Sequence, residues 1–260
     1  TTTGRVIEDI DLLIASTFTG DFLTPSVAAL IQGKLGLPQS VGVVDMNAAC
    51  AGFVYGLATA QAYITAGMCK KVLVVGAECM SKIVDYTDRN TCVLFGDGAA
   101  AMLVEHSPDN PGFLGFHAGA EGQSADRLYC TNLAEAMNGE ELPIKRFLWQ
   151  DGRAVYNYTI KTVPPAVKAL TERAGMEVTD IDWFVPHSAN IRMIQSIAEK
   201  LSIPMEKTLM SVVEFGNTSS ASIPLAIWLA LKEGKIKEGD ILALYGFGGG
   251  LNHAGVVIRW

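Results

Sequence analysis

Short apolar runs alternate with longer stretches of helical spacing along the chain. In the first part of the chain, the runs that predict buried strands cover 11–16, 41–46, 71–76 and 99–105. Between them, two stretches predict helices, over 25–35 and over 50–67. Strands that are apolar throughout and alternate with helices are typical of α/β proteins with mainly parallel sheets.

The second part of the chain repeats this order. Val6–Ser16 has the sequence VIEDIDLLIAS, and Glu177–His187 has the related sequence EVTDIDWFVPH. The elements predicted after the second copy are a helix over 190–201, a strand over 208–213, a helix over 220–234 and strands over 240–246 and 254–259. The repetition predicts two halves with pseudo-twofold symmetry, over 1–150 and 151–260, whose loops can meet at one site.

A different composition separates the two copies. Pro111–Asp151 is rich in Gly, Asn and Glu, and we interpret it as a long surface insertion that covers a binding cleft. After it, Tyr156–Ala174 predicts an amphipathic helix that is interrupted near Pro164 and Pro165, because proline cannot continue the hydrogen bonding of a helix.

Composition narrows the classes of function. The formal net charge is −7 and the pI about 5.1, which argues against sequence-independent binding to nucleic acid. The five cysteines are an odd number without a C-x-x-C pair, so we expect neither a disulfide framework nor a zinc ribbon. No signal peptide and no membrane-spanning segment are expected. We therefore predict a cytoplasmic protein.

The first candidate for chemistry is Cys50, in the segment DMNAACAGF (45–53), where a strand gives way to an apolar helix. A cysteine in a first helical turn lies near unpaired N–H groups and the positive end of the helix dipole, both of which favour the thiolate. The alternative is a small buried hydrophobe, which is the commoner role for a free cysteine.

His187 and Asn217 follow predicted strands of the second part. His187, in VPHSAN, lies just past a buried strand, where an imidazole could polarise a carbonyl or move a proton; a structural histidine explains the position equally well. Asn217, in FGNTSS, falls near the position that Cys50 holds in the first part. It could cap the following helix or donate hydrogen bonds to a developing enolate oxygen.

A glycine-rich segment, GFGGG (246–250), follows a predicted strand. Glycines permit close approach of the main chain to a ligand, so a phosphate cradle, a turn and an oxyanion hole all remain open. A P-loop is excluded, because no Gly-Lys-Ser/Thr follows. No spacing of His, Cys and Asp indicates a metal site.

Five segments together resemble the signatures of a known family, 3-oxoacyl-acyl-carrier-protein synthase III. They are NAACAGF (47–53), FGDGAA (95–100), PHSAN (186–190), GNTS (216–219) and GFGGG (246–250), and the resemblance covers essentially the whole chain. It implies a thiolase-like five-layer αβαβα fold, usually in a homodimer. The implied activity is decarboxylating condensation of an acyl-coenzyme A primer with malonyl-acyl carrier protein, which initiates fatty acid biosynthesis.

The resemblance also implies roles for single residues. Cys50 would carry the acyl group, while His187 and Asn217 would stabilise the enolate left by decarboxylation. The main-chain N–H groups of Cys50 and Gly249 would form the oxyanion hole, and Phe247 would flank the cysteine. No metal or redox cofactor is implied; acyl-coenzyme A and malonyl-acyl carrier protein are the substrates.

Three further positions match substrate-binding positions of the family. Arg89 and Arg192 would lie at the entrance for coenzyme A or the carrier protein. Thr24 would line the acyl pocket from the partner subunit. Because Thr24 is smaller than an aromatic residue, we predict that primers longer than acetyl, or branched ones, are accepted.

The chain departs from the family pattern in two ways. Family members usually have a further N-terminal segment, so we expect the first half of this chain to lack its first strand. Ser188 stands where the pattern has Gln after the histidine.

Related activities remain as alternatives. Starter condensing enzymes of polyketide or quinolone type share the Cys, His and Asn. Chalcone synthases usually have Gly-Phe-Gly-Pro-Gly in the last loop, elongating synthases use two histidines, and thiolases need a second cysteine near the C-terminus, whereas none lies beyond Cys130. A non-catalytic partner of this fold would be expected to lose the three residues, and a plain esterase lacks its Gly-x-Ser-x-Gly elbow here.

Overall fold

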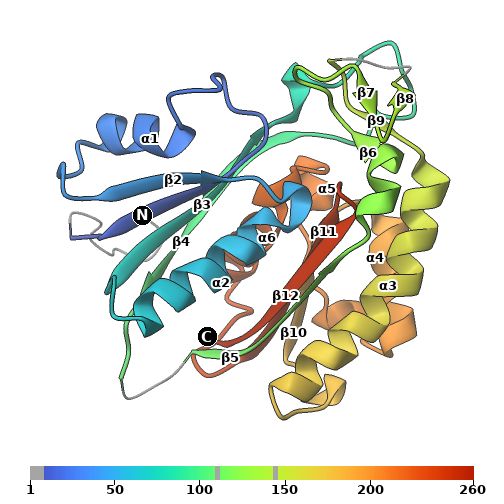
Figure 1. Cartoon of the computed structure of the whole chain (residues 1–260). Coiled ribbons are helices and arrows are strands. Elements are labelled where there is room, and N and C mark those ends of the chain that lie inside the picture. The colour runs from blue at the N-terminus through green and yellow to red at the C-terminus, as the bar shows by residue number, and fades with distance from the viewer. Residues whose placement is uncertain (1–8, 109–111, 143–145) are drawn as a thin grey trace.

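The structure is a computed structural model, which describes residues 9–108, 112–142 and 146–260. Five layers lie side by side across the molecule (Figure 1). Their order is helix α1 (Val27–Leu35), a first sheet, the central helices α2 (Gly52–Thr65) and α6 (Ser222–Lys232), a second sheet, and the outer helices α3 (Gly152–Arg173) and α4 (Ile191–Leu201). The predicted five-layer αβαβα arrangement is confirmed.

The first sheet has the order β2-β1-β3-β4. Its strands are β1 (Leu12–Ser16), β2 (Gly42–Met46), β3 (Lys71–Cys79) and β4 (Asp97–Glu105). β1 runs parallel to both of its neighbours, and β4 is antiparallel to β3. All five residues of β1 are buried, because α1 packs on one face of this sheet and α2 on the other. The predicted repeat begins at Val6, and its residues 6–8 lie outside the described residues.

The second sheet has the order β10-β11-β12-β5. Its strands are β10 (Trp183–Pro186), β11 (Ile241–Gly248), β12 (Asn252–Arg259) and β5 (Phe113–Ala120). β10 is parallel to β11, and β12 is antiparallel to both β11 and β5. Each sheet therefore contains a parallel pair followed by an antiparallel strand, as two related halves require.

The prediction of a surface insertion over Pro111–Asp151 is wrong for the part that forms β5. Phe113–Ala120 pairs with β12 as an edge strand of the second sheet, while Pro111 lies outside the described residues. The rest of the segment carries the short pairs β6 (Leu128–Tyr129) with β9 (Trp149–Gln150) and β7 (Ala136–Met137) with β8 (Glu140–Glu141). These lie at one end of the molecule near the start of α3 (Figure 1). The division of the chain into halves over 1–150 and 151–260 stays a proposal. Strand β5 precedes that boundary in the sequence but belongs to the second sheet.

The predicted strand over 208–213 is also wrong. Only Thr208 bridges to Phe184 of β10, and the chain then turns into the short helix α5 (Val212–Phe215). The cause is a side-chain hydrogen bond, since the N–H of Ser211 donates to Ser188 Oγ at 3.0 Å instead of continuing along β10.

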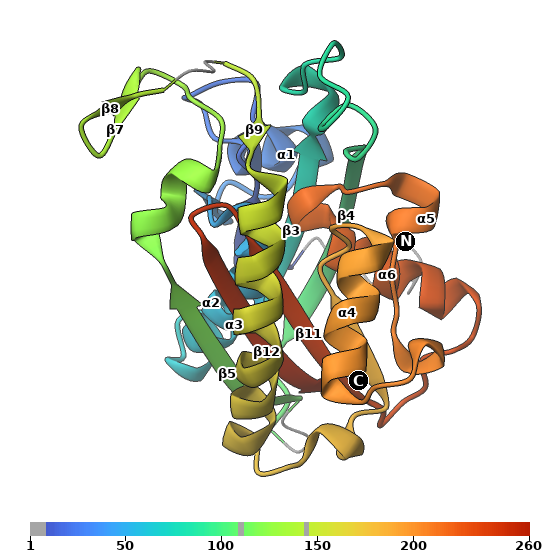
Figure 2. The ribbon, with the colours of Figure 1, turned by 90° about the vertical axis from the view of Figure 1, so that its right-hand side faces the viewer.

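The predicted interruption at Pro164 and Pro165 is absent from α3. The helix runs from Gly152 to Arg173 through both prolines, and Figure 2 shows it as one continuous ribbon beside α4. It begins earlier than predicted because Asp151 caps it, accepting a hydrogen bond from the N–H of Ala154 at 3.0 Å. Its buried face packs on the second sheet, which holds the helix together where the two prolines remove hydrogen-bond donors.

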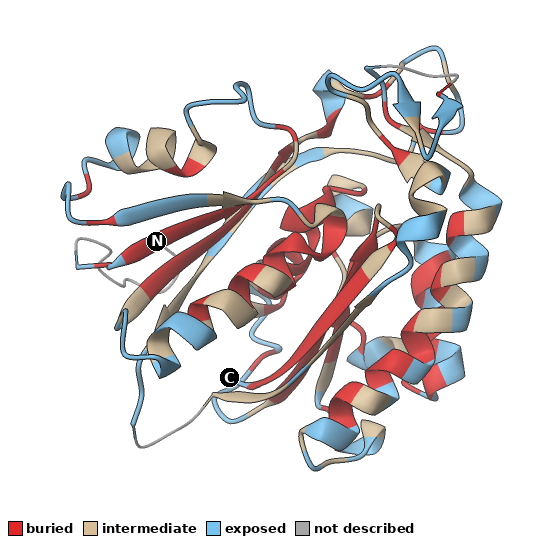
Figure 3. Cartoon of the chain, in the orientation of Figure 1, coloured by how far each residue is buried: buried red, intermediate tan, exposed pale blue. Residues whose placement is uncertain are grey.

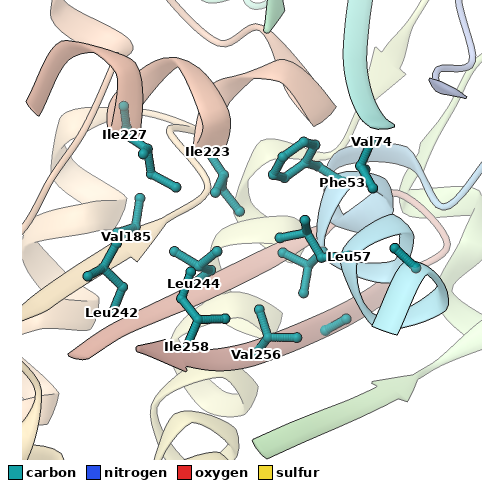
Figure 4. Close-up of a cluster of buried hydrophobic side chains, with 14 of the residues drawn as sticks. Phe53, Leu57, Val74, Val185, Ile223, Ile227, Leu242, Leu244, Val256 and Ile258 are labelled. Atoms are coloured by element: carbon teal, nitrogen blue, oxygen red, sulfur yellow. The ribbon is translucent and has the colours of Figure 1, made fainter. Parts of the chain in front are cut away.

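The largest core cluster fills the space between the two sheets. Figure 3 shows the central helices as mostly buried, and Figure 4 shows side chains of both sheets meeting those of α2 and α6. Phe53 and Leu57 of α2 and Ile223 of α6 are among its members. This packing fixes where α2 and α6 begin, and both helices begin at the site described next.

Within the described ranges, no helix is both long and apolar enough to cross a membrane. The cytoplasmic location stays a prediction.

Candidate active site

Cys50 lies at the junction between β2 and α2, in the 3₁₀ turn Ala49–Ala51. The turn is shaped by Asn47, whose Oδ1 accepts a hydrogen bond from the N–H of Ala49 at 3.1 Å, and by the left-handed backbone of Ala49, with φ of 45°. The Cys50 side chain is 8% exposed. Its Sγ accepts a hydrogen bond from Ser219 Oγ of the other half at 3.2 Å.

Burial raises the pKa of the Cys50 thiol to about 12. The hydroxyl of Ser219 and the main-chain N–H groups of Cys50 and Gly249 act in the opposite direction, and the charge of Glu78 adds to the increase in pKa. The N–H groups near the start of the helix favour the thiolate, as expected, but desolvation of the buried thiol outweighs them. The oxyanion hole predicted at the N–H groups of Cys50 and Gly249 stays a proposal.

His187 lies immediately after β10, where its N–H donates to the carbonyl of Tyr245 at 2.8 Å. Its side chain is 2% exposed and lies edge-on to Phe247, with ring centroids 5.2 Å apart. Its Nδ1 is 2.7 Å from Ser222 Oγ. Burial lowers the pKa of His187 to about 3, although the main chain of Ser219 acts in the opposite direction. The imidazole is therefore neutral at physiological pH and can act as a hydrogen-bond donor.

Asn217 is fixed by the first half of the chain. Its N–H donates to the carbonyl of Leu94 at 2.8 Å, and its carbonyl accepts from the N–H of Gly96 at 3.0 Å. A Cβ on Gly96 would lie 2.0 Å from the carbonyl oxygen of Phe215, so only glycine permits this approach. The FGDG segment thus positions the asparagine of the other half. The Oδ1 of Asn217 accepts from the N–H of Ser219 at 2.9 Å, which leaves the NH₂ group for a ligand.

The end of β11 closes over Cys50. A Cβ on Gly248 would lie 2.8 Å from both Cβ and Sγ of Cys50, so this strand end approaches the cysteine more closely than any side chain would allow. The glycine-rich segment therefore serves as a wall of the cysteine site. Of the roles that the sequence left open, this position beside the Cys50 sulfur suits an oxyanion hole, which stays a proposal.

These residues converge on one cavity of about 820 Å³. Five of the predicted site residues line it: Cys50, His187, Asn217, Phe247 and Gly249. The rest of the lining is largely apolar and includes Met80, Leu128, Tyr129, Leu148 and Val155, as a cavity for an acyl chain would be.

The structure does not bring the other three predicted residues into this lining. Arg89, Arg192 and Thr24 are exposed. Both arginines are next in the sequence to lining residues, Arg89 to Asn90 and Arg192 to Met193. Their roles stay proposals.

Sequence reasoning missed two serines of the site. Ser219 donates to the Cys50 sulfur, and Ser222 contacts the His187 ring. The only signal was a run of small hydroxyl residues, TSSAS (218–222), at a strand–helix junction. The departure at Ser188 has a structural explanation, because its Oγ accepts the N–H of Ser211 and holds the chain that follows Thr208.

In the part of the chain that the structure describes, no group of three or more His, Cys, Asp or Glu side chains could hold a metal ion. The site instead joins a buried cysteine, a neutral histidine and an asparagine at the meeting of two related halves. A five-layer fold with this site defines a cysteine-dependent acyltransferase of the thiolase-like class.

Comparison with known proteins gives the family. Residues 44–122 match the family 3-oxoacyl-[acyl-carrier-protein] synthase III, and residues 171–260 match its C-terminal part. A beta-ketoacyl-[acyl-carrier-protein] synthase III 2 of Halalkalibacterium halodurans is 57% identical over 98% of this chain and 77% of its own length. Its counterpart in Bacillus anthracis is 51% identical over 100% of this chain and 79% of its own length.

Among solved structures, a beta-ketoacyl-[acyl-carrier-protein] synthase III from Thermus thermophilus superposes with a TM-score of 0.93 at 41% identity, covering 96% of this chain and 77% of the other. The chain belongs to the 3-oxoacyl-[acyl-carrier-protein] synthase III family.

Proposed function

We propose that the chain condenses an acyl-coenzyme A primer with malonyl-acyl carrier protein to give 3-oxoacyl-acyl carrier protein, the step that initiates fatty acid synthesis. The observation that carries the proposal is the convergence of Cys50, His187 and Asn217 from two halves of the fold on one apolar cavity. The substrates supply all reacting groups, and the reaction needs no further cofactor.

In the first step, Cys50 Sγ attacks the thioester carbon of the primer, and coenzyme A leaves with the thiol proton. The oxyanion that forms would lie beside the N–H groups of Cys50 and Gly249, both of which favour negative charge on the Cys50 sulfur. The raised pKa of Cys50 makes the free thiol a weak nucleophile, so stabilisation of this oxyanion has to supply much of the rate.

In the second step, malonyl-acyl carrier protein loses carbon dioxide, and the bond electrons form an enolate. His187 and Asn217 offer two neutral N–H donors to the enolate oxygen. Neutral donors suit decarboxylation, because the enolate forms without removal of a proton and needs no base. The enolate carbon then attacks the acyl thioester, and Cys50 leaves as the thiolate that takes up a proton.

Arg89 and Arg192 are proposed to bind anionic groups of coenzyme A or of the carrier protein near the mouth. Their exposure and their places beside Asn90 and Met193 support this role.

We also propose a homodimer formed through the edge of the first sheet. β2 is the edge strand, and its residues Val43 and Val44 are exposed although apolar. Phe22 and Leu23 are exposed too, and they line a second hollow of about 860 Å³. Phe18, Asn47 and Cys130 line both this hollow and the Cys50 cavity, so a partner loop placed here would lie next to the primer site.

The first test is the intact mass of the protein after incubation with acetyl- or isobutyryl-coenzyme A, for the natural chain and for Cys50→Ala. We expect an acyl adduct on the natural chain alone, and 3-oxoacyl product once malonyl-acyl carrier protein is added. An adduct that persists in Cys50→Ala would refute the assignment of the nucleophile. Strict preference for acetyl would refute the role of Thr24 in admitting larger primers.

Sedimentation tests the dimer. Val43→Asp places a charge on the proposed edge and should yield monomers, whereas Val213→Asp, on the exposed helix α5, should leave the molecular mass unchanged. Equal masses for both variants and the natural chain would contradict the interface.

A further inference from the structure

Ser222 lies behind the His187 ring, on the side away from the cavity. It is the first residue of α6 and is completely buried. Its Oγ is 2.7 Å from His187 Nδ1 and accepts a hydrogen bond from the N–H of Ser188 at 3.2 Å. We propose that the Ser222 hydroxyl donates to Nδ1 and thereby fixes His187 in the tautomer that carries its proton on Nε2.

The direction of this hydrogen bond follows from counting protons. A serine hydroxyl has one proton and two lone pairs, and the N–H of Ser188 uses one lone pair of Ser222. If Nδ1–H also donated to Ser222, the hydroxyl proton would need another acceptor, and the described residues offer none within hydrogen-bond distance. A buried hydroxyl proton without a partner is unfavourable. The hydroxyl therefore donates to Nδ1, and a neutral imidazole with Nδ1 unprotonated carries its proton on Nε2.

The corresponding position in the other half supports a dedicated role for Ser222. There the first residue of the helix is Gly52, and a Cβ on it would lie 2.1 Å from Ser16 Oγ. Ser16 pairs with Gly76, and His187 lies opposite Gly246 where the register of β10 and β11 continues. In the second half, Ser222 thus lies behind His187. In the first half, Ser16 takes the place of the histidine, and glycine takes the place of Ser222 because a side chain at Gly52 would clash with Ser16.

The surrounding serines hold Ser222 in place. Ser211 Oγ donates to the carbonyl of Ser222 at 2.9 Å, and Ser188 Oγ accepts the N–H of Ser211. This gives Ser188 a second part in the site, since its N–H also fixes the Ser222 hydroxyl. All three serines are buried.

The tautomer matters for one step of the proposed function, on which this inference rests. With the proton on Nε2, His187 can donate to the enolate oxygen alongside Asn217. With the proton on Nδ1, Nε2 would present a lone pair to the same oxygen, which is repulsive. Ser222 is therefore a positioning residue for the decarboxylation step, and acylation of Cys50 does not depend on it.

The test combines ¹⁵N-histidine NMR with step-resolved kinetics on Ser222→Ala, Ser222→Cys and the control Thr171→Ala, which removes a buried hydroxyl from α3. His187→Gln identifies the His187 signals. We expect the natural chain and Thr171→Ala to show protonated Nε2, and Ser222→Ala to show a mixture of tautomers. In Ser222→Ala, the rate of Cys50 acylation should stay within about twofold, while kcat for condensation falls about 10- to 100-fold. This is less than the ~10²- to 10³-fold loss expected for a missing transition-state donor, because part of the population keeps its proton on Nε2. Ser222→Cys, with a weaker donor of similar size, should fall between.

Two results would overturn the inference. One is a natural chain whose His187 carries its proton on Nδ1. The other is a Ser222→Ala protein with an unchanged tautomer, or with acylation and condensation reduced equally. Failure of the proposed function would look different, because the natural chain would then form no acyl-Cys50 or no product whatever its tautomer.

Discussion

The two junctions that lead into the central helices, 47–52 after β2 and 217–222 after α5, have the same backbone and different chemistry. In each, an Asn Oδ1 accepts the N–H of the residue two positions later. That residue is left-handed, with φ of 45° at Ala49 and 49° at Ser219, and a 3₁₀ turn then leads into α2 or α6. Asn217 therefore corresponds to Asn47, and Cys50 corresponds to Ser220. The expectation that Asn217 falls near the position of Cys50 is off by three residues.

The strands that face these junctions differ at the position that determines whether each site is open or filled. Gly76 of β3 and Gly246 of β11 occupy equivalent places, since a Cβ on either would clash with the main chain of the opposite junction. Two residues further on, β11 has Gly248 and β3 has Glu78. Gly248 leaves the Cys50 sulfur open to the cavity, whereas Glu78 fills the equivalent space and accepts a hydrogen bond from Ser220 Oγ at 3.0 Å. The same scaffold thus gives one open site and one filled by a carboxyl group.

The largest effect should come from making the first junction resemble the second. Cys50→Ser places at the nucleophile position the residue that the second junction already has. A hydroxyl there is a far weaker nucleophile than a thiol, and we expect condensation to fall at least about a thousandfold. Intact mass should show no acyl adduct after incubation with the primer. Cys69→Ser, beyond the other end of α2, is the control and should acylate normally. A Cys50→Ser protein that turns over at near-natural rates would break the comparison.

A side chain at Gly248 should close the open site. In Gly248→Ala the added Cβ would lie 2.8 Å from the Cys50 sulfur, so the strand or the cysteine has to move. We expect acylation to slow about a hundredfold and stability to fall by about 1–3 kcal/mol, as overpacking of a core does. Acylation kinetics and thermal unfolding measure the two effects. Gly33→Ala is the control, since nothing lies within 4 Å of its Cβ. Equal acylation rates for both variants would contradict the proposed wall.

Much of the site was predictable because its signals are local in sequence. Cys50 and His187 each follow a strand, and the order of the five signature segments placed both of them and Asn217 in one family. The burial that raises the pKa of Cys50 was not predictable, because the residues that exclude water from it come from loops distant in the sequence. The same holds for Ser219, whose contact with the sulfur spans 169 positions of the chain.

The two wrong predictions of strands and loops also come from contacts between residues distant in the sequence. Phe113–Ala120 lies in a segment with the composition of a loop, and only its pairing with β12 makes it a strand. The segment over 208–213 has the composition of a strand, and a hydrogen bond from Ser211 to Ser188 removes it from the sheet. In both cases a tertiary contact overrode the local pattern.

The pH dependence of Cys50 reactivity tests how strongly its junction is desolvated. Because burial raises the pKa of the thiol to about 12, only a small fraction is thiolate at neutral pH. Alkylation by iodoacetamide should therefore speed up about tenfold per pH unit from pH 6 to 9 without a plateau. The rate constant is followed by intact mass, with Cys50→Ala to subtract the other cysteines. A plateau near pH 7 would show that the donors around the sulfur outweigh its burial.

Protonation of Glu78, which fills the second site, should be measurable in the pH dependence of the unfolding free energy. Burial raises the pKa of Glu78 to about 7, although donors from Thr19, Ser220, Phe18 and Thr17 oppose the shift. Between pH 4.5, the ordinary pKa, and 7, the folded protein binds this proton more tightly than the unfolded chain. The resulting stabilisation is complete below pH 4.5 and is lost as the pH rises through 7, with a slope of up to about 1.4 kcal/mol per pH unit.

Glu78→Gln cannot titrate, so its unfolding free energy in urea should lose this slope between pH 5 and 7, while Glu214→Gln, which removes an exposed carboxyl from α5, should keep the natural curve. If Glu78→Gln and the natural chain give parallel curves, Glu78 is ionised in the folded protein and its four donors outweigh its burial. The Glu78 carboxylate would then accept hydrogen bonds from residues of both halves while charged. Ser220→Ala, which removes one of those donors, should then destabilise the protein more at pH 8 than at pH 5.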